Sequence, residues 1–190
     1  MSETQPVIAA VVRTHVENAA FFWAQRDTLA AEDPPDTEAI AFVDARLEAN
    51  LDALRIAGAA VWPFIIEAFE AFPEKGELFV LTHRALETGD ARRLEQAVAF
   101  ARVCDDGTRG LCGAFEWLPP KVTAAVVRDW VDSGDSARTE AALAAMIAHG
   151  GHPGDRLERL MRNGSDTVRR MAASFASRPG RPDATVTGGD

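Results

Sequence analysis

Apolar residues recur at three- and four-residue steps along the first third of the chain, which is the spacing of one face of an amphipathic helix. From Pro6 onward the apolar positions are Ile8, Val11, Val12, Ala19, Phe22 and Trp23. Two prolines within residues 33–36 predict the end of this first helix. A second helix is predicted from Thr37, as its N-cap, to about Gly58, with the apolar stripe Ile40, Val43, Leu47, Leu51 and Leu54. A third is predicted over 61–72, with Pro63 in its first turn.

A short pattern recurs three times in the second half, at Gly89-Asp90, Gly134-Asp135 and Gly164-Ser165. In each copy the glycine is followed by a polar residue of the N-capping type, and an alanine lies eight positions after the glycine. These alanines are Ala97, Ala142 and Ala172. The repetition predicts three helix pairs, 76–87 with 90–103, 122–131 with 136–148 and 154–162 with 166–177, and equivalent second-helix positions for the three copies. A further helix is predicted over 108–117, between the first two pairs, and it ends before Pro119 and Pro120.

The pattern as a whole predicts an all-α protein: a HEAT-like α-solenoid of antiparallel helix pairs that follows an N-terminal region of longer helices. We expect one helical-repeat domain over 1–177, with the N-terminal helices in 6–72 and the hairpins in 73–177. Residues 178–190 contain almost no apolar side chains and are expected to form a disordered tail. Hydrophobic residues make up 47% of the chain and there is no tyrosine, which argues against a β-rich fold.

Charge and cysteine content narrow the classes of partner. The formal net charge is −9, so binding to a nucleic-acid backbone is disfavoured. Cys104 and Cys112 have neither the number nor the spacing of a disulfide framework or a zinc ribbon and are expected to be buried thiols. The N-terminus lacks the pattern of a secretory signal, and no apolar run approaches the about 18 residues of a membrane span. A cytoplasmic location without membrane contact is therefore expected.

Two N-terminal stretches carry a family resemblance. Residues 16–26, VENAAFFWAQR, and 46–58, RLEANLDALRIAG, resemble the opening of a family of uncharacterised bacterial HEAT-repeat proteins. Members of that family are often encoded beside type VI secretion genes, near PAAR-type spike proteins and effector adaptors. The resemblance implies a helical-repeat fold and a link to secretion, and no catalytic chemistry. This chain is shorter than those members, and a short array needs a polar capping helix or a partner over its open end.

The candidate binding residues lie in these stretches or, for Asp44, just before the second one. Asp44, Glu48 and Asp52, called here the acidic ladder, are spaced four residues apart and share one helix face. The acidic ladder is either a solvated face, with its charge offset by Arg55, or the receptor of a basic partner. Trp23 and Arg26 allow two interpretations as well: a buried cluster with Arg–carboxylate pairs that joins the first two helices, or an exposed Trp/Arg hot spot.

Candidate catalytic and metal groups are sparse. His149-Gly150-Gly151-His152 is the nearest approach to a metal motif, but its two glycines favour a loop between helices. His15 lies on the apolar side of the first helix and is expected to be packed or hydrogen-bonded. The chain contains no GxxxxGK[ST], HExxH or GxSxG motif. We therefore expect no catalytic residue, no metal and no cofactor.

These observations favour a non-enzymatic helical-repeat scaffold that binds another protein. Within the family resemblance, it is expected to be a type VI secretion accessory, either an adaptor for an effector or spike protein or an immunity-like partner of a basic toxin. The charge of −9 favours a cationic partner. The alternative is an enzyme on a HEAT-like scaffold, such as a DNA-base glycosylase or a chromophore lyase, which would need a basic groove near Trp117 or Trp130. The identity of the partner and the oligomeric state are left open.

Overall fold

The computed structural model describes residues 8–177, and all regular structure in that range is helical. The helices are α1 (Ala9–Ala30), α2 (Thr37–Ala57), α3 (Trp62–Ala71), α4 (Lys75–Thr88), α5 (Ala91–Ala101), α6 (Gly107–Trp117), α7 (Pro120–Trp130), α8 (Ser136–Ala148), α9 (Leu157–Met161) and α10 (Asp166–Ala176). Single 3₁₀ turns, Gly58–Val61 and Gly154–Arg156, precede α3 and α9. The all-α prediction is confirmed. Pro6 and the predicted tail 178–190 lie outside the described residues.

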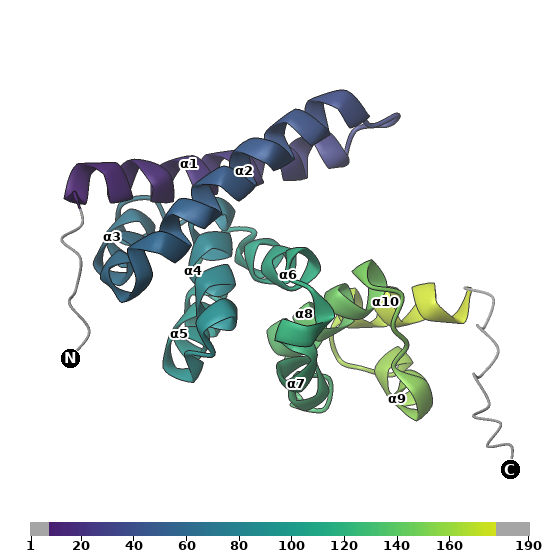
Figure 1. Cartoon of the computed structure of the whole chain (residues 1–190). Coiled ribbons are helices and arrows are strands. Elements are labelled where there is room, and N and C mark those ends of the chain that lie inside the picture. The colour runs from purple at the N-terminus through teal and green to yellow at the C-terminus, as the bar shows by residue number, and fades with distance from the viewer. Residues whose placement is uncertain (1–7, 178–190) are drawn as a thin grey trace, which may run out of the picture.

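The two longest helices, α1 and α2, pack side by side as a hairpin across one end of the molecule (Figure 1). Along α2 the predicted stripe of Val43, Leu47, Leu51 and Leu54 is buried, whereas Ile40 is only half-buried. The predicted N-cap is wrong by one residue. Asp36 caps α2, because its carboxylate accepts hydrogen bonds from the amides of Glu38 and Ala39, and Thr37 is already helical.

The three predicted helix pairs are present, since α4 packs on α5, α7 on α8 and α9 on α10. Asp90, Asp135 and Ser165 are the N-caps of α5, α8 and α10, and each side chain accepts a hydrogen bond from the amide three residues later. The repeated alanines Ala97, Ala142 and Ala172 have no exposed surface. The capping and small-residue parts of the repeat are therefore confirmed.

The prediction that the three copies occupy equivalent positions is wrong. Helices α4, α6, α8 and α10 contact one another in series, and α5, α7 and α9 lie along one side of this row (Figure 1). The first copy, α5, is thus a flanking helix, whereas α8 and α10 belong to the row. The reason is α6, an 11-residue helix that fills the longer interval between the first two copies and stacks between α4 and α8.

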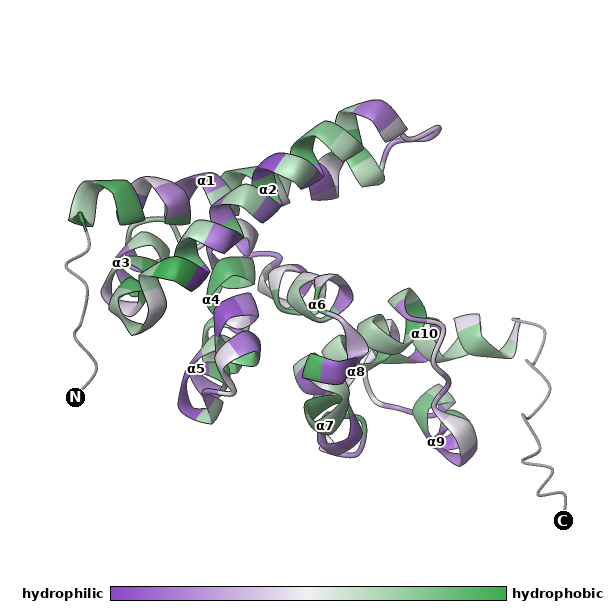
Figure 2. Cartoon of the chain, in the orientation of Figure 1, coloured by the Kyte–Doolittle hydropathy of each residue, from purple (hydrophilic) through white to green (hydrophobic). Residues whose placement is uncertain are grey.

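A single cluster of buried apolar residues runs from α1 to α10. Within it Phe69 of α3 stacks on Phe100 of α5, with ring centroids 4.3 Å apart. In Figure 2 apolar residues form bands on α3 and at the start of α1. Polar residues gather at the loop end of the α1–α2 hairpin. Most of the large apolar side chains that are exposed within residues 8–177 lie between residues 8 and 72.

One helical run departs from the expectation that no segment could span a membrane. Thr37–Ala71 is long enough and, in one 18-residue window, apolar enough (mean hydropathy 1.3) to cross a bilayer, judged by length and composition alone. Such a run is weak support for a membrane span, because packed helices of soluble proteins have the same composition. Here the run is divided at Gly58, whose φ of 61° separates α2 from α3, and α2 packs along α1.

Candidate binding surface

Arg55 of α2 is the centre of a polar cluster between α2 and α4. Its Nη1 donates to Glu48 Oε1 (2.8 Å) and is paired with Asp52, and its Nε donates to Glu87 Oε1 of α4 (2.5 Å). Burial alone would lower the pKa of Arg55, but these three carboxylates raise it above its usual value. The guanidinium is thus a permanent cation that joins the acidic ladder to α4.

Glu87 is the inner acid of this cluster. Its second carboxylate oxygen accepts a hydrogen bond from Arg84 Nη1 (2.9 Å). Burial alone would raise the pKa of Glu87, but Arg55, Arg84 and the neighbouring His83 together hold it below its usual value. Sequence reasoning missed Glu87 and Arg84, and only their helical spacing of three residues hinted at a pair.

Asp44 at the other end of the acidic ladder is bound by α1. Arg26 Nε donates to Asp44 Oδ1 (2.9 Å), and the Arg26 guanidinium lies 5.5 Å from the ring centroid of Trp117 in α6. The Trp117 indole N–H donates to Glu48 Oε2 (3.3 Å). All three acids of the acidic ladder therefore have a basic partner within the protein, and the ladder helps to hold the α1–α2 hairpin against α4 and α6.

Trp23 is a core residue, so the interpretation as a buried cluster between helices is confirmed for it, and its alternative prediction as an exposed binding residue is wrong. The side chain is 2% exposed and stacks on Phe79 of α4, with ring centroids 4.7 Å apart and an interplanar angle of 9°. Gly113 of α6 lies directly against the indole, since a Cβ there would be 2.1 Å from Trp23 Cζ2. The helical spacing of α1 placed Trp23 on its apolar face, and α4 and α6 pack against that face through Phe79 and Gly113.

His83 of α4 is a buried histidine that sequence reasoning did not identify. It is 1% exposed, and neither ring nitrogen has a hydrogen-bond partner within the described residues. Burial lowers its pKa to about 4, although the nearby Glu87 carboxylate opposes this shift. The imidazole is therefore neutral near pH 7 and lies beside the charges of Glu87, Arg55 and Arg84.

The other histidines and the cysteines are engaged in local contacts. His15 Nδ1 lies 2.9 Å from Asn50 Oδ1, and His149 Nε2 lies 3.2 Å from the carbonyl oxygen of Phe115. Cys104 and Cys112 are both buried free thiols. Burial raises the pKa of Cys112, so the group stays protonated at neutral pH. Neither cysteine has the environment of a reactive thiolate.

A second charged cluster lies on the opposite side of Trp23. Asp27 of α1 accepts hydrogen bonds from Lys75 Nζ (2.8 Å) and from Arg109 Nε (2.7 Å), and Arg109 Nη1 also donates to Glu116 (2.8 Å). The Arg109 guanidinium lies 5.6 Å from the Trp23 ring centroid. The α1–α2 hairpin is therefore attached to α4 and α6 by charged groups on both sides of the buried indole.

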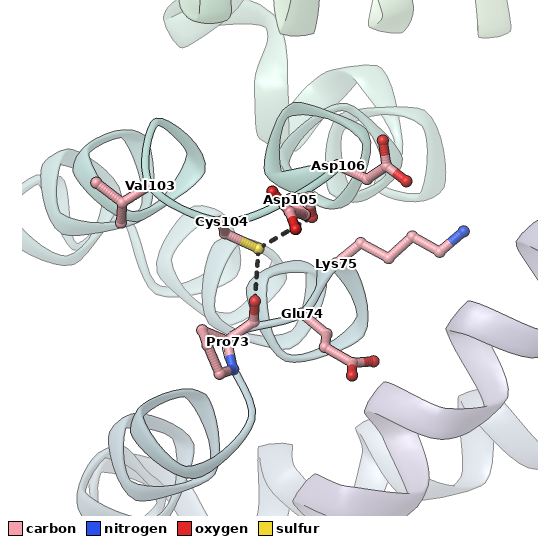
Figure 3. Close-up of a pocket in the computed structure, with 7 residues that line it drawn as sticks. All are labelled: Pro73, Glu74, Lys75, Val103, Cys104, Asp105 and Asp106. Carbon is pink, nitrogen blue, oxygen red and sulfur yellow. Dashed lines mark hydrogen bonds between the residues drawn. The ribbon is translucent and has the colours of Figure 1, made fainter.

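Lys75 separates two hollows on this side. The acidic hollow, about 400 Å³, is lined by Pro73, Glu74, Lys75, Val103, Cys104, Asp105 and Asp106 (Figure 3). At its floor Cys104 Sγ donates to the carbonyl oxygen of Pro73 (2.9 Å). The apolar hollow, about 500 Å³, is lined by Phe21, Ala24, Gln25, Thr28, Leu29 and Lys75. Sequence reasoning found neither, because the residues come from three segments that lie far apart in the chain.

Comparison of the chain with models of protein families, with curated proteins and with solved structures finds no match in any of the three.

Proposed function

We propose that this protein is a non-enzymatic scaffold that binds another protein in the bacterial cytoplasm as an accessory of type VI secretion. The two roles that fit are an adaptor for an effector or spike component and an immunity-like partner of a basic toxin. The link to secretion rests on the resemblance of 16–26 and 46–58 to the HEAT-repeat family. In this proposal the helix pairs form a HEAT-like array that carries the binding surface.

The observation that carries a binding role is the distribution of exposed apolar side chains. Within the described residues the large exposed ones are Ile8, Val11, Phe21, Phe42, Ile56, Phe72, Val103 and Met161. Six of these eight lie between residues 8 and 72. Scattered exposed apolar residues need no explanation, but their concentration in one part of a protein is typical of an interaction surface.

The charge distribution supports a cationic partner. The net charge is −9, and complementary fields accelerate encounter with a basic protein. Asp44, Glu48 and Asp52 remain candidate contacts together with Arg26 and Arg55, because Asp52 in particular is 61% exposed at its side chain. Their internal pairing means that a partner would have to compete with Arg26 and Arg55 for them.

The test is affinity capture from the source bacterium with the tagged full chain as bait, read out by quantitative mass spectrometry. The control bait is a helical protein matched in size and net charge. Enrichment of an effector, toxin or spike component over the control is expected. Recovery of no secretion component at bait concentrations that saturate the resin would overturn the secretion assignment.

A further inference from the structure

The apolar hollow and the acidic hollow lie next to each other, because Lys75 lines both. The apolar hollow lies along α1, where Phe21 is 61% exposed. The acidic hollow lies where the turns before α4 and α6 meet, and Val103 on its rim is 79% exposed. Solvated apolar surface thus flanks a group of carboxylates.

The carboxylates of the acidic hollow differ from those of the acidic ladder. Glu74, Asp105 and Asp106 are exposed, and within residues 8–177 their side chains have no ion pair or hydrogen bond. Lys75 does not neutralise them, because its ammonium is bound to Asp27. In Figure 3 the Lys75 side chain extends away from the sulfur of Cys104. The negative charge of the acidic hollow is therefore uncompensated within the described residues.

Two of these acids lie at helix N-termini. Glu74 and Asp106 occupy the N-cap positions of α4 and α6, where the positive end of a helix favours a carboxylate. Neither side chain bonds to the helix amides, so both remain available to a ligand. The same negative surroundings, together with burial, raise the pKa of Glu77 and of Cys104.

We propose that the two hollows together dock a segment of a partner protein in which an apolar side chain is flanked by lysine or arginine. The apolar side chain enters the apolar hollow beside Phe21 and Leu29, and the basic side chain binds the carboxylates of Glu74, Asp105 and Asp106. This inference deepens the proposed function and rests on it, since it assigns the cationic partner to a specific surface. It moves the expected contact from the acidic ladder to the opposite side of Trp23.

Burial of apolar surface and charge complementarity together favour such a partner segment. The apolar hollow, at about 500 Å³, is an open depression along α1 that can receive an apolar side chain. Covering Phe21 and Leu29 removes apolar surface from water, which supplies affinity. Three unpaired carboxylates add attraction for a cation and repel acidic competitors, which supplies specificity. A phosphate-rich partner such as nucleic acid or an anionic membrane is repelled by the same groups.

The experiment uses fluorescein-labelled synthetic peptides and the full chain, with binding followed by fluorescence anisotropy at low and moderate salt. The test peptide alternates leucine and lysine over seven residues. One comparison peptide replaces its leucines by serine, and another replaces its lysines by glutamate. We expect the leucine–lysine peptide to bind at least tenfold more tightly than either comparison peptide, and its affinity to fall as salt rises.

Two variants locate the site. Phe21→Ser changes the apolar hollow, and the triple variant Glu74→Gln, Asp105→Asn, Asp106→Asn changes the acidic one. Asparagine suits position 106, whose φ is 54°. The matched controls are Phe42→Ser, at a side chain of similar exposure, and the triple variant Glu32→Gln, Glu38→Gln, Asp129→Asn, with the same change in net charge. Circular dichroism and thermal melting verify that every variant is folded.

We expect each hollow variant to weaken binding of the leucine–lysine peptide at least fivefold, and both controls to leave it within twofold. Equal binding by hollow variants and controls would overturn the inference, and so would equal binding of the leucine–glutamate peptide.

The proposed function and the docking site can be tested apart from each other. If the hollow variants lose the peptide but the wild-type bait captures no secretion component, the docking site stands and the secretion role falls. If the wild-type bait captures a secretion protein and the hollow variants capture it equally well, the docking site falls and the secretion role stands.

Discussion

The indole of Trp23 stacks face to face on Phe79 with its six-membered ring edge directly over the Cα of Gly113, where a Cβ would be 2.1 Å from Cζ2. This contact sets the distance between α1, α4 and α6. Two ion pairs flank this contact, Arg26 with Asp44 and Lys75 with Asp27. They supplement the packing of the Trp23 indole between the helices. The apolar hollow depends on the same interface, since it is lined by residues of α1 and by Lys75 at the start of α4.

Replacement of Gly113 by alanine is expected to destabilise the protein by about 1 to 3 kcal/mol, because the added methyl group overlaps the ring of Trp23 and α6 must move away. The measurement is urea unfolding followed by tryptophan fluorescence. Gly164→Ala is the control, since a Cβ there meets nothing within 4 Å. Equal unfolding midpoints for the two variants would contradict the packing of Trp23 described here.

Ala142→Phe is expected to destabilise the protein by about 1 to 3 kcal/mol through overpacking between α8 and its neighbours, because Ala142 has no exposed surface. Ala99→Phe in the last turn of α5 makes the same chemical change at an exposed helical position. Thermal melting distinguishes the two. A melting temperature of Ala142→Phe as high as that of Ala99→Phe would show that α8 is not packed at this position.

Acid is expected to destabilise the wild-type protein partly through His83. The folded imidazole has its pKa lowered to about 4, whereas the unfolded one titrates near 6.5, so the unfolded state binds more protons between these values. Stability therefore falls as the pH decreases through this window, by about 2 kcal/mol between pH 7 and pH 5. His83→Leu should remove this part of the pH dependence, as measured by urea unfolding at both pH values.

The control for this effect is His152→Gln, which alters an exposed histidine. That variant should keep the pH dependence of the wild type. An equally steep loss of stability in His83→Leu would mean that the buried imidazole does not contribute.

Arg55 and Glu87 are expected to be energetically coupled. Arg55→Leu removes the cation shared by Glu87 and two acids of the acidic ladder, and Glu87→Gln removes the inner carboxylate. A double-mutant cycle by chemical denaturation should yield a coupling of about 0.5 to 3 kcal/mol. The same cycle for Arg162 and Glu158, an exposed pair 3.5 Å apart, should yield less than about 0.5 kcal/mol. Additive effects at Arg55 and Glu87 would contradict a structural role for the ion pair.

The sequence by itself determined the local features of this protein. The helical spacing of apolar residues predicted α1 to α4 and the buried positions of Val43 and Leu47. The recurring N-cap residue and alanine predicted α5, α8 and α10. These features depend on contacts within one helix or with the next helix, and such contacts leave a periodic pattern. Even the capping error at Thr37 is a shift of one residue.

Only the tertiary structure decided which side each charge faces and which elements meet. It placed α5 beside the row that contains α8 and α10, because α6 stacks between α4 and α8. It buried Trp23, paired all three acids of the acidic ladder and left Glu74, Asp105 and Asp106 without a cationic partner among residues 8–177. Residues 27, 75 and 109 meet from three different helices. The periodic pattern of the sequence does not predict such ion pairs, because pairs between distant segments depend on how whole helices pack.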